Sequence, residues 1–496
     1  MQLWSFHRYR RPQLCLDAIE HAHDSRTVTL YCGTQTYRFS FDDADAAAQT
    51  AAEIANLRDA GSPLWETVRA SEPGSAWHAL ATFLDTRSLI RETLNEAVTS
   101  LARQARRVED LVSGTHAAIM DRLASVEHAA ATAHADRLYR AIDRTLAAGT
   151  SFFAGRDPYD AAFQPNFYLG LAAIEFEYLR HASPPALAAV KALLGRVARA
   201  RSPAADAVAT INQAGGLYDQ HDLASHLWLI AHCLVQSVSD ASARFRATPL
   251  PDTSLSSGLE FMRRTELLTR ETLSLWGPNR YVTALEALKD AASPLIAGPY
   301  IEQYHVTRRF VEIVSPLLSK RLARPLRRLM YQYYSEEVGH EALESTTCEA
   351  LGVSPRALDA ALPLPLHFAF VDALTVAAEL DPITSFAAIM VIEGVFGEPP
   401  RMSLRLASVG EANPAFRSVS QDHDDLNDTL NHNSIARDCF EHVSAVSPDR
   451  QRSAMQRVLF LLELNHRAWD GIAEFYGSQK VLMLQGPLGL PMTPQP

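Results

Sequence analysis

Glu336-Glu337-Val338-Gly339-His340-Glu341 lies inside the run Tyr331–Leu351, whose pattern predicts one continuous helix. Residues three apart on a helix differ by about 60° in azimuth, so the side chains of Glu337 and His340 should leave the same face. Carboxylates and imidazoles bind iron, manganese or zinc, and helical bundles build metal sites from Glu-x-x-His pairs that project inward. Because exposed helices often contain this spacing, the pair needs support from elsewhere in the chain.

That support comes from Glu393, an acidic residue in an otherwise apolar segment. The segment Phe386–Phe396 is hydrophobic on both sides of Glu393. A carboxylate buried there would be costly unless a cation lies beside it. Glu393 is therefore a third candidate ligand, on a different helix from Glu337 and His340.

The composition predicts a mainly α-helical protein of more than one domain. The chain has 496 residues, of which 47% are hydrophobic and 21% are charged. Alanine and leucine are abundant and runs of β-branched residues are rare, so most of the chain should be helical. The net charge of −11 argues against a nucleic-acid partner.

The first residues and the apolar runs predict a cytoplasmic protein. Met1–Arg8 contains no apolar segment typical of a signal peptide. No uninterrupted apolar stretch reaches the length of about 18 residues that indicates a membrane span, so no membrane association is expected. The five cysteines are scattered without the spacing of a metal site or a disulfide framework.

Residues 1–92 carry the only convincing strand signal. Alternating polarity over Thr27–Cys32 and Gln35–Phe39 predicts a β-hairpin. A helix over Asp42–Leu57 should follow, then a short helix and a longer one over Ala76–Glu92. A ribbon beside such helices is a winged-helix arrangement.

This order of elements, with Leu57–Val68 leading to Leu80–Glu92, resembles the PqqD-like peptide-recognition domain. The resemblance implies that the domain binds the leader of a ribosomally made precursor peptide as an added strand. The hairpin residues implied in peptide binding are Thr29, Tyr31, Tyr37 and Phe39. Two alternatives stay open: a small domain for packing or oligomerisation, and DNA binding, which the acidic residues over Asp42–Asp59 disfavour.

Residues 93–258 are expected to form a helical middle region that ends in a linker of low periodicity, and residues 481–496 a flexible tail. The middle region contains three histidines, His221, His226 and His232. Their intervals of five and six do not place them on one helical face, and no carboxylate is in register with them. We therefore interpret them as structural or surface residues.

The region 259–480 is predicted to form a compact α-bundle, because proline or glycine separates its helical segments. These helices are expected over residues 295–319, 322–351, 364–377, 382–397, 415–442 and 449–476.

The bundle resembles the heme-oxygenase-like diiron oxidases. The resemblance rests on an ordered series along slightly less than half of the chain: Gly298–His305, Glu336–Glu341, Glu393, a late segment with Asp and His, and Trp469–Tyr476. It implies a metal site that includes Glu337, His340 and Glu393. Glu302 and His305 would face the same interior and line the substrate pocket or support the metal ligands.

The late segment departs from the family, in which a helix supplies His, then Asp four residues on, then His three further. Here His423 and His432 would point about 180° apart on a straight helix, unless a π-bulge between 423 and 428 brings them together. The set Asp425, Asp428 and His432 shares one face without distortion. We expect Asp428 and His432 to be ligands and leave His423 and Asp425 as competitors for the remaining place.

The resemblance implies Fe(II), with two ions expected, O2 as co-substrate and an external reductant as electron source. Carboxylate-rich sites with few nitrogen ligands suit iron(II), and no glycine-rich phosphate loop indicates a flavin or nicotinamide. The expected function is oxidation of a natural-product precursor, a residue of a ribosomal peptide bound through the N-terminal domain. One alternative is the same chemistry on a free amino acid or amine, with the N-terminal half serving homodimerisation. The other is a metal-free binding or scaffold protein on the same fold.

Overall fold

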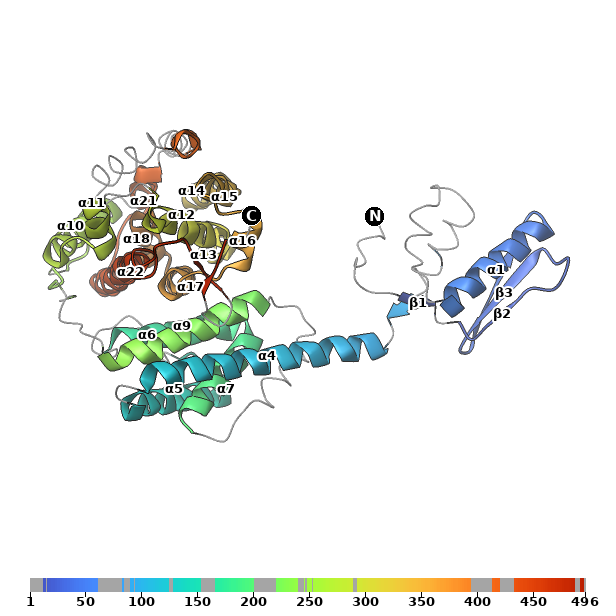
Figure 1. Cartoon of the computed structure of the whole chain (residues 1–496). Coiled ribbons are helices and arrows are strands. Elements are labelled where there is room, and N and C mark those ends of the chain that lie inside the picture. Colours follow the sequence, from blue (N-terminus) through green and yellow to red (C-terminus); the bar gives the residue numbers. More distant parts are fainter. Residues whose placement is uncertain are drawn as a thin grey trace. The chain divides into compact units, whose positions relative to one another are not determined.

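The structure is a computed structural model of the chain, and it forms two compact units, Met1–Arg106 and Arg107–Pro496. The predicted mainly α-helical class with a small sheet is confirmed (Figure 1). The residues described are 12–14, 16–60, 83, 90–92, 94–124, 128–152, 166–199, 220–239, 245, 248–251, 253–288, 292–393, 413–419, 432–486 and 491–494. The boundary between the units falls inside the long helix α4 (Leu94–Leu123).

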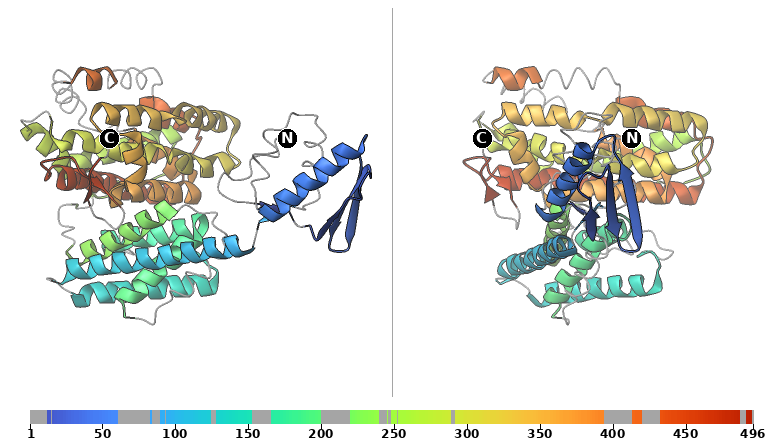
Figure 2. Two further views of the ribbon diagram at one scale, coloured as in Figure 1. Left: turned by 45° about the vertical axis from the view of Figure 1, so that its right-hand side comes forward. Right: turned by 90° about the vertical axis from the view of Figure 1, so that its right-hand side faces the viewer.

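The first unit contains a three-stranded antiparallel sheet in the order β2-β3-β4 (Figure 2). Strands β3 (Thr27–Cys32) and β4 (Gln35–Ser40) form the predicted hairpin, with Cys32 opposite Gln35. Gly33 in the turn has a φ of +59°, a conformation that glycine adopts without strain. Strand β2 (Ala18–Glu20), which pairs with β3, was not predicted.

Helix α1 (Ala44–Ala60) packs on one face of this sheet. Its buried residues form a small core with Val28 and Leu30 of β3; these helix residues are Ala47, Ala51 and Ile54. The carboxylate of Asp43 accepts a hydrogen bond from the Ala46 amide, as expected for a helix N-cap.

A further strand pair corrects the end of the last predicted helix of this unit. Strand β1 (Pro12–Leu14) pairs with β5 (Ile90–Glu92), so the helix predicted over Ala76–Glu92 does not extend to Glu92. The other residues on which the winged-helix prediction depends, 61–82 and 84–89, lie outside the described part of the chain. The winged arrangement therefore stays a prediction.

The second unit begins with four helices that follow α4 in the sequence. They are α5 (His128–Ala148), α6 (Phe167–Ala182), α7 (Pro184–Val197) and α9 (Gln220–Ser239). All four pack against one another (Figure 1). Helix α6 is buried around most of its circumference, because its sequence is apolar on nearly every side.

The remaining helices form the C-terminal bundle. They are α10 (Gly258–Trp276), α11 (Arg280–Ala287), α12 (Pro294–Thr307), α13 (Phe310–Ser319), α14 (Arg324–Glu337), α15 (His340–Ala350), α16 (Pro355–Ala360), α17 (Pro365–Leu380), α18 (Pro382–Ile392), α21 (His432–Glu441) and α22 (Pro448–Tyr476). Helix α17 packs against α12, α13, α18 and α22 of the bundle and against α6 and α9 of the middle helices. One hydrophobic core therefore runs from the middle helices into the bundle.

Two of the predicted bundle helices are broken in the structure. The helix predicted over 322–351 divides into α14 and α15, because Gly339 between them has a φ of +97°. The helix predicted over 295–319 divides into α12 and α13 at Arg309, whose side chain points into the interior. The helix predicted over 415–442 is helical at 414–419 and in α21, and the residues between lie outside the described part.

The C-terminal tail is anchored at one point. Strand β6 (Leu484–Gln485) pairs with β7 (Pro491–Met492), and the Leu362 amide donates a hydrogen bond to the carbonyl of Gln485. This part of 481–496 is thus ordered against the bundle rather than flexible as predicted. Within the described residues, no helix has the length and apolar character needed to cross a membrane.

Candidate metal centre

Glu337 and His340 meet across the break between α14 and α15. Glu337 is the last residue of α14 and His340 the first of α15, so they do not lie on one continuous helix as predicted. Even so, His340 Nδ1 lies 3.0 Å from Glu337 Oε2, and both side chains are buried. The turn at Gly339, rather than a continuous helix, brings the side chains of Glu337 and His340 together.

Glu393 follows the last turn of α18 and is half-buried. The hydroxyl of Tyr333, which is buried on α14, donates a hydrogen bond to the Glu393 carboxylate. Burial raises the pKa of Tyr333 well above its usual range, and the negative charges of Glu393 and Glu337 raise it further. Tyr333 therefore keeps its proton and donates it in a hydrogen bond to Glu393.

A third acidic residue, Glu344, belongs to the same neighbourhood and was not predicted. Its side chain is buried on α15, and burial together with the charge of Glu337 raises its pKa to about 8. Glu344 lies four residues after His340, one helical turn further along α15. That spacing was visible in the sequence and could have identified it.

Helix α21 adds the last described element of this region, because it packs against α14 and α18. Its first residue is His432, one of the predicted ligands. The other three predicted ligands of the late segment, His423, Asp425 and Asp428, lie outside the described residues. The choice between a bulged and a straight helix for this segment stays a prediction.

The donors in this region fit a transition-metal ion. Glu337, Glu344 and Glu393 offer carboxylate oxygens and His340 offers an imidazole nitrogen, a combination that suits iron or manganese. Burial raises the energy of three nearby carboxylates unless positive charge compensates them. Glu337, His340, Glu344 and Glu393 therefore have the donor types that the prediction requires, but no three of their ligand atoms lie within 4.8 Å of one another.

Glu302 and His305 both face the interior from α12, as predicted. The Tyr476 hydroxyl and the Leu364 amide donate hydrogen bonds to the Glu302 carboxylate, and burial raises its pKa to about 8. Burial raises the pKa of the Cys348 thiol, and the carboxyl groups of Glu344 and Glu302, which lie near this thiol, raise it further.

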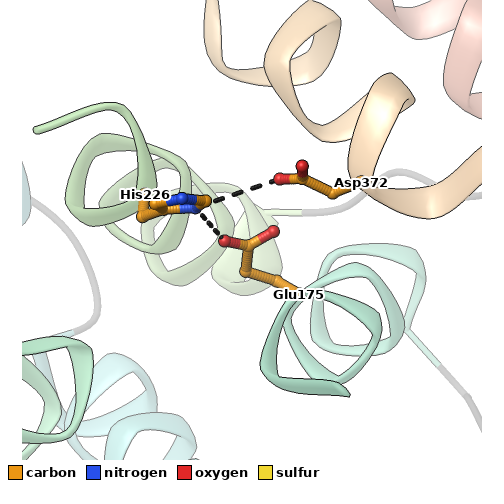
Figure 3. A group of neighbouring side chains, drawn as sticks. All are labelled: Glu175, His226 and Asp372. Atoms are coloured by element: carbon orange, nitrogen blue, oxygen red, sulfur yellow. Dashed lines mark hydrogen bonds and ion pairs between the residues drawn. The ribbon is translucent and has the colours of Figure 1, made fainter. Parts of the chain in front are cut away.

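A second cluster of ligand-type residues lies where α6, α9 and α17 meet (Figure 3). Glu175, His226 and Asp372 each offer one ligand atom, and the three atoms lie within 4.8 Å of one another. This buried Glu/His/Asp group could hold a metal ion. His226 had been interpreted as structural or surface because no carboxylate was in register; its partners come from other helices, which spacing along the chain does not reveal.

The cluster is bound to Arg309, the residue at the break between α12 and α13. The Arg309 guanidinium donates to the carboxylates of Asp372 at 2.5 Å and Glu312 at 2.6 Å. Burial lowers the pKa of His226 to about 4 and raises that of Glu175 to about 7. His226 is therefore a neutral imidazole at pH 7.

The four predicted peptide-binding residues do not share one face of the N-terminal sheet. Tyr37 and Phe39 pack against the core under α1 and contact the ring of Phe83. Tyr31 and Thr29 alternate with the core residues of β3 and point to the opposite face, where the Tyr31 hydroxyl donates to Glu20. Tyr37 and Phe39 thus lie on the edge strand β4, whereas Thr29 and Tyr31 lie on the central strand β3.

Among solved structures, a domain of unknown function with a heme oxygenase-like fold from Shewanella denitrificans OS217 is similar to part of this chain. The likeness covers 44% of this chain and 92% of that domain, with 16% sequence identity and a TM-score of 0.37. No family model and no curated protein matches this chain. The likeness is too distant to support an inference about activity.

Proposed function

We propose that this protein is a non-heme iron enzyme, with two irons, that uses O2 to oxidise a natural-product precursor. The observation that carries the proposal is the approach of Glu337 and His340, whose buried side chains lie 3.0 Å apart at a helix break. Glu393 directly follows α18 and His432 begins α21; these two helices pack together, and α21 also packs against α14.

Glu337, His340, Glu344 and Glu393 would hold the metal together with His432, Asp428 and either His423 or Asp425. Bound iron(II) would supply the activation of O2. Tyr333 fixes the orientation of Glu393 by donating its hydroxyl hydrogen, as groups around metal sites commonly do for ligating carboxylates. The burial of Glu337, His340 and Glu344 keeps bulk water away from these groups.

Iron binding and O2 consumption test this proposal. Purified protein given Fe(II) without oxygen is expected to bind up to two equivalents at this centre, and then to consume O2 with an external reductant. Glu344→Gln and Glu393→Gln keep the side-chain shape but remove a carboxylate ligand, and each should lower iron affinity at least about 10-fold. Glu349→Gln is the matched control, because Glu349 is exposed on the same helix as Glu344.

Unchanged iron binding in both carboxylate variants would contradict the site. A wild-type protein that binds no iron would favour the metal-free scaffold instead. If iron binds but O2 is not consumed, the protein is a metal-binding protein and not an oxidase.

The substrate that we propose is a residue of a ribosomal precursor peptide whose leader adds to strand β4. In the described part of the first unit, β4 pairs with β3 on one side and with no strand on the other. The amide of Phe41 donates to the carbonyl of Arg26, so hydrogen-bonded pairs alternate along the hairpin and the amide of Arg38 points to the open edge. A sheet edge whose backbone amides point outward can form hydrogen bonds with an added strand.

Arg38→Pro tests the added strand without breaking the bonds between β3 and β4. Proline removes one outward amide, and edge strands tolerate it. With labelled leader peptide, we expect wild-type protein to bind at a micromolar or lower Kd and Arg38→Pro to bind at least about 10-fold more weakly. Arg38→Ala, which keeps the amide, is the control for lost charge.

Two outcomes would reject the peptide substrate. One is equal leader affinity in wild type and Arg38→Pro. The other is equal turnover of the full precursor and of a free amino acid or amine, which would favour the small-substrate alternative and a dimerisation role for the N-terminal half.

A further inference from the structure

Three helices bring Glu175, His226 and Asp372 to one point in the interior of the second unit. Glu175 comes from α6, His226 from α9 and Asp372 from α17 (Figure 3). Their exposed fractions are 1%, 3% and 1%. His226 Nδ1 lies 2.5 Å from Glu175 Oε1 and 3.9 Å from Asp372 Oδ2. The group is therefore compact, buried and assembled from distant parts of the chain.

Two oxygen atoms of this group have no hydrogen-bond donor among the described residues. They are Glu175 Oε2 and Asp372 Oδ2, and both are buried. An unsatisfied buried carboxylate oxygen costs free energy, and each such atom in a native protein calls for an explanation, of which a bound ion is one. Both atoms belong to the side chains that converge on His226.

The charges around the cluster are also unbalanced. When ionised, Glu175, Glu312 and Asp372 carry three negative charges, and Arg309, which contacts Glu312 and Asp372, carries one positive charge. Two negative charges are then left on this group, in which Glu175 and Asp372 are buried and Glu312 is half-buried, and burying uncompensated charge is costly. A divalent cation would balance them.

The surroundings resemble those of a protein metal site. Arg309 donates to Asp372 Oδ1 and so orients this carboxylate, leaving Oδ2 for a cation. The rings of Phe368 and Tyr178 pack on His226, with centroids at 4.7 and 5.9 Å, and shield it from water. Apolar surroundings lower the local dielectric constant and so strengthen the attraction between carboxylates and a cation.

We propose that Glu175, His226 and Asp372 form a second metal site, separate from the proposed iron centre, that binds a divalent transition-metal ion. One imidazole with two carboxylates suits manganese, iron, cobalt or zinc. Its ligands come from the middle helices α6 and α9 and from the bundle helix α17. The bound ion therefore holds the middle helices to the bundle. This inference does not depend on the proposed oxidation chemistry.

The rival explanation is a proton shared between the two carboxyl groups, which lie close enough for a hydrogen bond when one is protonated. A shared proton would satisfy the same oxygen atoms without a metal. The two explanations differ in metal stoichiometry, and Co(II) is a suitable probe because it stays divalent in air and absorbs visible light in such sites.

The experiment uses full-length protein stripped with a chelator and titrated with Co(II). A Glu337→Gln/His340→Gln variant, which lacks two ligands of the iron centre, should still bind one equivalent. Adding Glu175→Gln or Asp372→Asn to this variant should weaken that binding at least about 100-fold. X-ray absorption at the cobalt edge should report one imidazole among oxygen ligands. His232→Gln is the matched control: His232 is a half-buried histidine on α9 outside the cluster, and its variant should bind Co(II) like its parent.

Absence of tight Co(II) binding in the folded double variant would overturn the proposal and leave the shared proton. Equal affinity with and without Glu175→Gln would also overturn it. If the double variant does not fold, as judged by circular dichroism, the wild-type protein decides, since Glu175→Gln alone should then lower its Co(II) content by one equivalent.

Discussion

Glu302 is a carboxyl group enclosed by the protein, and its proton links stability to pH. Burial raises its pKa to about 8, from about 4.5 for an ordinary glutamate, although Tyr476 and Leu364 donate hydrogen bonds to it. The folded protein therefore holds a proton that the unfolded chain has released above pH 4.5. The contribution of this proton to the stability of the fold is fully present below pH 4.5 and is lost as the pH rises towards 8.

Glu302→Gln should remove this pH dependence, because glutamine is neutral throughout. Between pH 5 and 8 the free energy of unfolding of the wild type should fall by up to about 1.4 kcal/mol per pH unit more than that of the variant. Chemical denaturation of metal-free protein at several pH values measures this difference. The exposed Glu349→Gln should keep the wild-type slope; a Glu302→Gln slope equal to the wild type would show that Glu302 is ionised in the folded state.

At the scale of secondary structure, local patterns predicted the elements well and their interruptions poorly. The β3–β4 hairpin and the beginnings of α17 and α18 followed from alternation and from proline at the first turn, both local signals. The break at Gly339 depends on a positive φ, and glycine within a helical pattern indicates such a break only weakly.

Local patterns also indicated some of the residues of the candidate site. Glu337, His340 and Glu393 stand out by spacing and apolar context, and the Tyr333 hydroxyl on α14, the helix that ends at Glu337, donates a hydrogen bond to Glu393. The Glu175–His226–Asp372 group could not be found in this way, because its members are separated by 51 and 146 residues. No periodicity within one element relates them; only the packing of α6, α9 and α17 brings them together.

For the whole molecule, the arrangement of hydrophobic cores predicts how the chain unfolds. The first unit has its own small core around Val28, Leu30 and Ile54. In the second unit a continuous core includes Phe176 on α6 and Phe386 on α18, although the sequence suggested that 93–258 and 259–480 are separate domains. Residues that share one core usually unfold together.

We therefore expect the middle helices and the bundle to unfold in one transition, separate from the N-terminal sheet. Phe176→Ala and Phe386→Ala should each lower the stability of the second unit by about 3–5 kcal/mol, and each should reduce the amide protection of both α9 and α17. Leu30→Ala, at about 2–5 kcal/mol, should reduce protection only in β3, β4 and α1. Hydrogen exchange followed by mass spectrometry measures all three. Loss of protection in α9 but not in α17 after Phe176→Ala would mean that residues 93–258 form a domain of their own, because a shared core transmits the loss to both helices.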